Sequence, residues 1–221
     1  MERTDLAALL LRLTQGNEAF ARSPLYAMER RQTFDAQHPC VVVVSCSDSR
    51  VSAPIVFSSP HIGVLFESKT AGQALSSSDI ESVRYAIVTF TPKPRAVIVM
   101  GHTGCGAVHA ATDAVLDQMR SANPSMCAKH DGKQQPQQVF PTIVRNIAPA
   151  VREAVQTLPA DVVQSSIDGD RESTALLVNT ASAINARQKA QELAFLMADT
   201  GVPVVAALYD ISTGRVHWLA Q

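Results

Sequence analysis

Two patterns of hydrophobic residues alternate along this chain: short unbroken runs, and longer segments in which apolar residues recur at helical spacing. The run at residues 40–45, Cys-Val-Val-Val-Val-Ser, is unbroken and β-branched, which indicates a strand buried on both faces, as in a parallel sheet. Residues 62–66 and 95–100 are predicted as a second and a third strand. Residues 203–209 and 215–219 predict a terminal hairpin around the turn sequence Asp-Ile-Ser-Thr-Gly.

The first helical segment covers residues 6–20, where the spacing of the apolar residues predicts an amphipathic helix with an apolar side that needs a partner surface. The apolar residues are Leu6, Leu9, Leu10, Leu13 and Phe20. Further along, Ser78-Asp-Ile-Glu81 has the spacing of a capping box. It predicts a helix from there to about residue 88.

Three more helices are expected in the second half of the chain. One follows Cys105 and runs to Met119, and one covers residues 139–158 with an interruption near Pro149. The last covers residues 171–199 and is closed by a glycine and a proline in the usual order. The polar stretch at residues 121–138 predicts a surface loop.

Strands that alternate with helices predict an α/β fold with a mostly parallel central sheet, covered by helices on both faces, and an antiparallel edge hairpin at the C-terminus. The chain of 221 residues contains no internal repeat. We therefore expect one domain over residues 1–221, with an N-terminal helical arm at residues 1–35.

Composition narrows the range of functions. The net charge is -1, and no cluster of Lys or Arg favours a nucleic-acid or membrane partner. The four cysteines are too sparse for a disulfide framework and fit a reducing compartment. The apolar run near the N-terminus is too short for a signal or membrane segment. These features predict a soluble, cytoplasmic protein that acts on a small molecule.

Candidate chemistry lies at the ends of two predicted strands. Cys46 closes the first run and His102 closes the third, while Cys105 follows three residues later. The carboxyl ends of strands in an open α/β sheet are where functional groups gather. Two thiolates and one imidazole suit Zn²⁺, and three protein ligands leave a fourth position open, as in catalytic zinc sites.

Asp48 and Arg50 follow Cys46 at alternate positions. In extended backbone, they lie on the same face as the cysteine, and an arginine beside a metal keeps a carboxylate ionised and oriented. Taken singly, a buried cysteine or histidine is more often a packing residue, and an Asp–Arg pair can be structural only. The joint spacing of all five residues favours a metal site.

With these residues in place, the chain resembles the β-class carbonic anhydrases. The resemblance rests on Cys46-x-Asp48-x-Arg50 and His102-x-x-Cys105. It extends to Gly16-Asn17-Glu-Ala-Phe20 in the first helix and to the turn after Tyr209. It implies one zinc ion per subunit and reversible hydration of CO2 to bicarbonate by zinc-bound hydroxide.

The resemblance also implies a role for each site residue. Cys46, His102 and Cys105 would be the metal ligands, and Asp48, held by Arg50, would accept a hydrogen bond from the zinc-bound hydroxide. The substrate pocket would be formed by Gln37, Phe66, Tyr85 and Gly106. This pocket would lie at a subunit interface, so a homodimer or a dimer of dimers is expected, with the N-terminal helix packed on the partner. The aspartate rests on zinc in some members of the family and on the arginine in others.

One segment departs from the family, which often has Leu-Phe-Val-Val-Arg-Asn-Ala-Gly-Asn where this chain has Leu65-Phe-Glu-Ser-Lys69-Thr70-Ala-Gly-Gln73. Lysine lacks the planar fork of arginine. We therefore expect the change to affect subunit packing and any inhibitory bicarbonate site that uses this arginine. Two alternatives to CO2 hydration stay open: a zinc-binding pseudoenzyme, and a hydrolase of carbonyl sulfide or carbon disulfide. His61, His109 and His130 are candidates for proton relay, and Cys40 and Cys127 have no assigned role.

Overall fold

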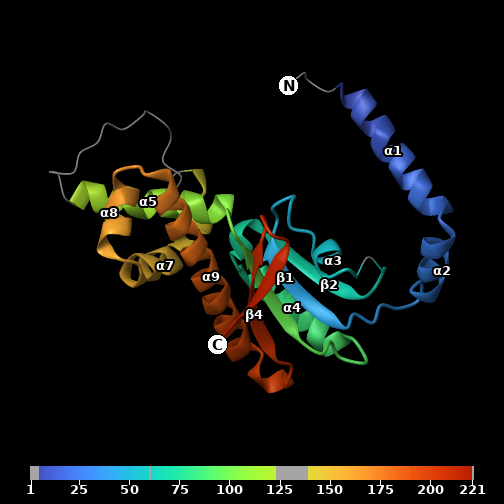
Figure 1. Ribbon diagram of the computed structural model, residues 1–221. Coiled ribbons are helices and arrows are strands. Elements are labelled where there is room, and N and C mark those ends of the chain that lie inside the picture. Colours follow the sequence, from blue (N-terminus) through green and yellow to red (C-terminus); the bar gives the residue numbers. More distant parts are fainter. Residues whose placement is uncertain (1–4, 60, 123–138, 221) are drawn as a thin grey trace.

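A five-stranded sheet forms the centre of the protein in the computed structural model, which describes residues 5–59, 61–122 and 139–220. The strands are β1 (Val41–Cys46), β2 (Leu65–Thr70), β3 (Val97–His102), β4 (Val204–Asp210) and β5 (Arg215–Leu219). Their order is β2-β1-β3-β4-β5. The first four are parallel, and β5 pairs with β4 in the antiparallel direction. The α/β fold and the antiparallel edge hairpin are confirmed (Figure 1).

The strand predictions agree with the structure except at one edge of the sheet, where β2 lies later in the sequence than expected. β1 and β3 are almost wholly buried, so their sequences are continuous apolar runs. The second strand was predicted at residues 62–66 and lies at Leu65–Thr70 instead. β2 is an edge strand in which all residues but Ser68 are half-exposed or exposed, and its last four residues are polar. An apolar run therefore could not locate it.

Helical cover over the two faces of the sheet is unequal. α4 (Ser77–Thr89) and α9 (Arg171–Leu196) cover one face, where they enclose Val42, Val44, Val97 and Val99. Among the described residues, the opposite face packs against the short helix α3 (Ala53–Val56) and its neighbours. Half-buried apolar side chains of β1, β4 and β5 complete that face.

A group of helices lies beyond the carboxyl ends of the strands (Figure 1). It consists of α5 (Gly106–Ala122), α7 (Pro141–Thr157), α8 (Ala160–Ile167) and the first half of α9. α8 was not predicted. The expected interruption of α7 near Pro149 is wrong, because the helix continues through this residue. Pro149 lies on the exposed side, and the buried side of α7 holds the helix together through tertiary packing.

Two further sequence predictions differ from the structure in detail. The capping box of α4 is formed by Ser76 and Asp79, each accepting a hydrogen bond from the backbone N–H of the other, and not by Ser78 and Glu81. The helix consequently begins one residue earlier than expected. Of the predicted loop at residues 121–138, the first two residues belong to α5, and the rest lies outside the described residues, as do Cys127 and His130.

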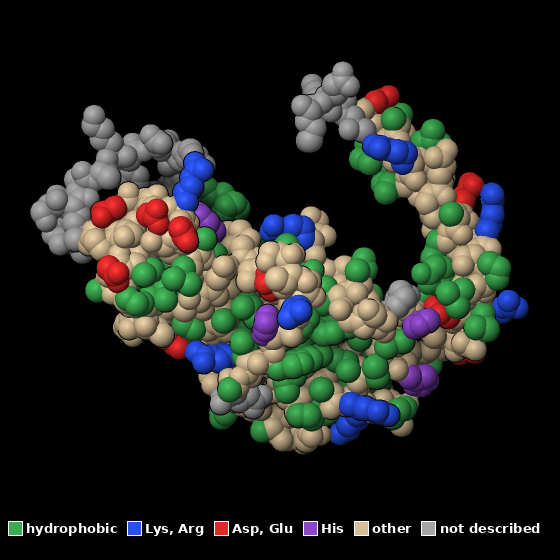
Figure 2. Space-filling view, viewed as in Figure 1, with side chains coloured by type: hydrophobic (Ala, Val, Ile, Leu, Met, Phe, Trp, Pro, Cys, Tyr) green, Lys and Arg blue, Asp and Glu red, His purple; other side chains and the backbone are tan. Residues whose placement is uncertain are grey.

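The N-terminal arm consists of α1 (Leu6–Arg22) and α2 (Pro24–Gln32). The predicted amphipathic helix is confirmed, and α1 has no buried residue. Figure 2 shows hydrophobic side chains along this arm, which stands away from the body of the molecule. α2 is anchored by Glu29, whose carboxylate accepts hydrogen bonds from the ring of His61 at 2.6 Å and from the N–H of Ile62 at 3.1 Å. No helix within the described residues has the length and apolarity needed to cross a bilayer.

Candidate metal centre

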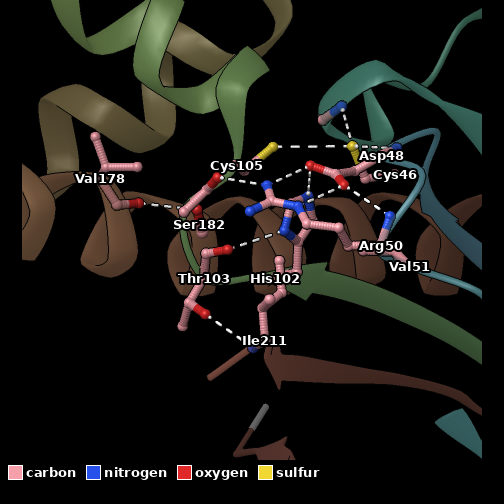
Figure 3. A network of polar contacts seen from close by, with 12 residues as sticks. Cys46, Asp48, Arg50, Val51, His102, Thr103, Cys105, Val178, Ser182 and Ile211 are labelled. Carbon is pink, nitrogen blue, oxygen red and sulfur yellow. Dashed lines mark hydrogen bonds and ion pairs between the residues drawn. The ribbon is translucent and has the colours of Figure 1, made fainter. Parts of the chain in front are cut away.

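The three predicted metal ligands meet at the carboxyl edge of the sheet. Cys46 is the last residue of β1, and His102 is the last residue of β3. Because these strands are parallel neighbours, their ends bring the two side chains together. Cys105 immediately precedes α5. All three side chains are buried, and Figure 3 shows them around one point with Asp48 and Arg50 beside them.

The geometry of this cluster fits a tetrahedral metal ion. The ligand atoms of Cys46, His102 and Cys105 all lie within 4.8 Å of one another. The two sulfur atoms are 3.9 Å apart, and two thiolates bound to one tetrahedral zinc at about 2.3 Å would be about 3.8 Å apart. The donor set and its spacing therefore match zinc.

The imidazole of His102 has one nitrogen satisfied and one free. Nδ1 lies 3.0 Å from the carbonyl oxygen of Thr103, which favours the tautomer with the proton on Nδ1. Nε2 is buried and has no hydrogen-bond partner among the described residues. A buried polar atom without a partner is costly, and a metal ion at this point would satisfy it.

The two thiols share their protons unequally. The Cys105 thiol, then His102 and the N–H groups of Gly72 and Asp48, lower the pKa of Cys46. The same contact with Cys46, together with burial, raises the pKa of Cys105. Without a metal, Cys105 therefore holds its proton more tightly than Cys46 does. A cation that binds both sulfurs takes the place of this proton.

Asp48 and Arg50 form a bidentate ion pair next to the ligands. Nε of Arg50 lies 2.9 Å from Oδ1 of Asp48, and Nη2 of Arg50 lies 2.6 Å from Oδ2. These hydrogen bonds hold the pKa of Asp48 well below its usual range. Oδ2 is 3.9 Å from Nε2 of His102. The carboxylate is thus ionised, turned towards the arginine, and close to the point where the ligand atoms converge.

A cavity of about 860 Å³ opens beside this ion pair. Its wall includes Arg50, Gly104, Gly106, His109 and Asn179. A Cβ atom added to Gly106 would meet nothing within 4 Å, so this residue borders open space at the start of α5. Gly106 is the one predicted substrate-pocket residue that lines this cavity.

The other three predicted pocket residues lie elsewhere within one chain. Phe66 and Tyr85 form an aromatic cluster with Phe90, at centroid distances of 5.9 and 5.6 Å. Phe66 is paired with Val42, four residues before Cys46, which places it about 13 Å along the strand from the metal ligands. Gln37 is exposed in the segment between α2 and β1. Their expected role in a pocket shared between subunits stays a prediction.

Sequence reasoning missed two side chains at this site. Asn179 Oδ1 accepts a hydrogen bond from the N–H of Gly104 at 2.8 Å, and Asn185 Nδ2 donates one to the carbonyl of Gly72 at 2.9 Å. Both asparagines belong to α9. The signal was present in the sequence, because each carboxamide stands among apolar residues of a helix. Lys69, at the departure from the family pattern, donates a hydrogen bond to the carbonyl of Val51.

The fold and the site define an α/β protein with a candidate three-ligand metal centre that has an open side. Within that class, the chain belongs to the carbonic anhydrase family, because the family model described as carbonic anhydrase matches residues 41–216. Solved structures of β-carbonic anhydrases have the fold expected from the resemblance. One such structure, the β-carbonic anhydrase CcaA, covers 96% of this chain and 99% of its own with a TM-score of 0.66 at 20% identity.

Two other proteins similar to this chain are a curated relative and a solved structure. Carbonic anhydrase 2 of Mycobacterium tuberculosis is 34% identical over 122 residues, which are 53% of this chain and 58% of that protein. The chain thus matches little more than half the length of this curated relative. A tetrameric β-carbonic anhydrase from Sordaria macrospora has a TM-score of 0.60 at 16% identity, covering 96% of this chain and 98% of its own. The expected enzyme class is confirmed at the level of the family.

Proposed function

We propose that this protein is a zinc-dependent carbonic anhydrase that hydrates CO2 reversibly to bicarbonate and a proton. One observation carries the proposal: Cys46, His102 and Cys105 converge within 4.8 Å, and the Asp48–Arg50 pair lies beside them. The first three residues would hold one zinc ion per subunit. In a carbonic anhydrase with three histidine ligands, zinc lowers the pKa of its bound water to about 7. Zinc held by the three residues here would likewise supply a nucleophile.

The residues around the ligands would orient the reactants. Asp48 is ionised, so it can only accept hydrogen bonds, and its position beside the ligand atoms allows it to accept one from the attacking oxygen. Arg50 fixes the plane of this carboxylate by two hydrogen bonds and bonds to the carbonyl of Gly104 at 3.3 Å. Gly106 leaves room for a small substrate.

We further propose a homodimer, or a dimer of dimers, in which the arms pack on partner subunits. α1 exposes a series of leucines, including Leu10 at 53% and Leu13 at 61%. One face of the sheet also has little helical cover within the described chain. In such a dimer, Gln37, Phe66 and Tyr85 of one chain would reach the site of the other. The relative from Sordaria macrospora is a tetramer, which supports an assembly of this kind.

The location and domain organisation remain parts of the proposal. The sparse cysteines and the even charge balance support a cytoplasmic protein. α9 contacts both the central sheet and the helices α5, α7 and α8, which supports one domain, with residues 1–35 as an arm. Neither alternative function gains support from the observations, since the relatives are carbonic anhydrases.

Stopped-flow CO2 hydration, with zinc content measured on the same sample, tests the proposed function. We expect one zinc per chain and an activity that rises over roughly pH 7 to 9, the range in which a zinc-bound water ionises. Full zinc occupancy without hydration over this range would favour the pseudoenzyme. Turnover of carbonyl sulfide or carbon disulfide, but not of CO2, would favour the hydrolase.

A further inference from the structure

Two asparagines on α9 reach two backbone segments that adjoin the metal ligands. Asn179 binds the N–H of Gly104, which lies between His102 and Cys105. Asn185, six residues further along the helix, binds the carbonyl of Gly72. One rigid helix thus contacts both halves of the candidate metal centre from behind.

Gly72 links the second contact to a ligand. Its carbonyl accepts from Asn185, and its N–H donates to the sulfur of Cys46 at 3.2 Å. Gly72 has a φ of 65°. A Cβ here would come within 2.5 Å of Ile147 and 3.0 Å of Ala107. The residue is therefore fitted closely between α5, α7 and α9, and its N–H is aimed at the thiolate.

These contacts are made at a cost to the core. Asn185 is fully buried, and its Oδ1 has no partner among the described residues. Gln73 is also buried, lacks partners for both polar atoms within the same part of the chain, and has a φ of 41°. A buried polar atom without a partner costs about 1–3 kcal/mol, and left-handed backbone is strained for a residue other than glycine. Packing alone would be better served by leucine at residue 185.

We propose that Asn179 and Asn185 are positioning residues that set the geometry of the metal ligands. Asn185 holds Gly72 by its carbonyl so that the N–H of the same residue stays on the Cys46 sulfur, and Asn179 holds the turn between His102 and Cys105. The N–H bond to sulfur also withdraws charge from the thiolate, which leaves a bound cation more acidic. The inference rests on the proposed function only in that the site binds a metal ion.

Metal affinity is the decisive measurement, because it does not depend on turnover. We expect N185L and N179A to weaken the zinc Kd by about 10- to 100-fold in competition with a chelator, the usual effect of losing a residue that orients a metal ligand. The thiolate-to-cobalt absorption band of the Co²⁺ form should shift in N185L, because its sulfur loses a hydrogen bond.

Ser182→Ala is the matched control. Ser182 lies on the same helix between the two asparagines and is fully buried. Within the described residues, its hydroxyl bonds only to the carbonyl of Val178. It should lower the melting temperature without changing the zinc Kd or the cobalt spectrum. An N185L protein with a wild-type zinc Kd would overturn the proposal.

The remaining outcomes are also decisive. If N185L does not fold, N179A decides, because Asn179 is only half-buried and its replacement is tolerated more easily; an unchanged zinc Kd in N179A would then refute the role. Failure of the proposed function can be told apart from failure of the positioning role. If CO2 were not the substrate, the wild-type protein would still bind zinc and the two variants would still bind it less tightly.

Discussion

Asp48 differs from an ordinary surface aspartate in what lies around it. Both of its oxygens bond to Arg50, and only 16% of its side chain is exposed. Arg84 and Asp199 form an ion pair of the same bidentate form on the surface, where the distances are 3.0 and 2.6 Å. The two pairs allow a comparison in which the geometry is matched and only the position differs.

Asp48→Asn should lower kcat for CO2 hydration by about 100-fold or more, the lower end of the effect of a positioned acid–base group. The amide can donate as well as accept, so it no longer fixes the orientation of the attacking oxygen. Zinc content should stay at one per chain, because the three ligands are intact. Stopped-flow kinetics with metal analysis measures both quantities.

Asp199→Asn is the control for this change. It breaks an ion pair of similar geometry far from the ligands and should leave kcat unchanged. Equal kcat values for wild type and D48N would remove Asp48 from the mechanism.

Asp210 provides a prediction for pH. Hydrogen bonds from Ser212, then Thr213, lower the pKa of this carboxyl to about 2, below the value of about 3.9 in an unfolded chain. A lowered pKa in the folded state adds stability above the unfolded pKa, and this stability is lost as the pH falls through the folded pKa. The difference in melting temperature between wild type and D210A should therefore be largest at neutral pH and shrink between about pH 4 and pH 2. A difference independent of pH would show that the carboxylate charge is not the cause.

The sequence predicts some residues of the site better than others. Cys46, Asp48 and Arg50 lie within five positions, so their spacing alone brings them together, and the ends of parallel strands add His102. Asn185 and Gly72 are 113 positions apart, and no local pattern links them. The proposed pocket role of Phe66 and Tyr85 requires a second chain, whose position one sequence does not give.

At the scale of elements, the buried strands were predicted at their places and one edge strand was displaced. β1 and β3 follow from unbroken β-branched sequence, whereas β2 is an edge strand whose last four residues are polar and resemble a loop. β5 is also exposed, but the turn sequence before it located it. The start of α4 was misplaced because two serines offer capping boxes, and Asp79 is the partner that also accepts from Ser68 of β2 at 3.2 Å. A tertiary contact thus accompanies the cap that the structure uses.

Pro149 gives a test at this scale. Proline inside a helix removes one hydrogen bond and costs about 3 kcal/mol, part of which is offset because it also restricts the unfolded chain. Pro149→Ala should therefore stabilise the protein by about 1–2 kcal/mol, since the side chain is exposed and little packing is lost. Urea denaturation measures the change.

Pro141→Ala is the matched control, because Pro141 is the first residue of the same helix. Proline is favoured there, where no N–H is needed. This variant should give no gain in stability. A P149A protein no more stable than P141A would mean that proline at this position does not destabilise α7.

At the scale of the whole molecule, the arm is the part that one chain leaves without a partner. Leu10→Glu with Leu13→Glu should convert the proposed dimer to a monomer in sedimentation velocity, because two charges would have to be buried in its interface. Hydration of CO2 should fall with it, since the pocket is shared in the proposed assembly. Arg12→Glu changes the charge of the same helix and should leave the dimer intact. A wild-type protein that is monomeric and fully active would refute the shared pocket.

The place of α9 in the chain has a consequence for biosynthesis. All three ligands have left the ribosome once residue 105 has emerged, yet α9 begins at Arg171 and contributes Leu177, Val178, Ala181 and Ile184 to the cluster that encloses Cys46 and Cys105. A nascent chain that ends before this helix carries every ligand but lacks the wall behind them. Metal capture is therefore expected late in synthesis, and a tightly held ion would mark a chain that has folded to its last helix.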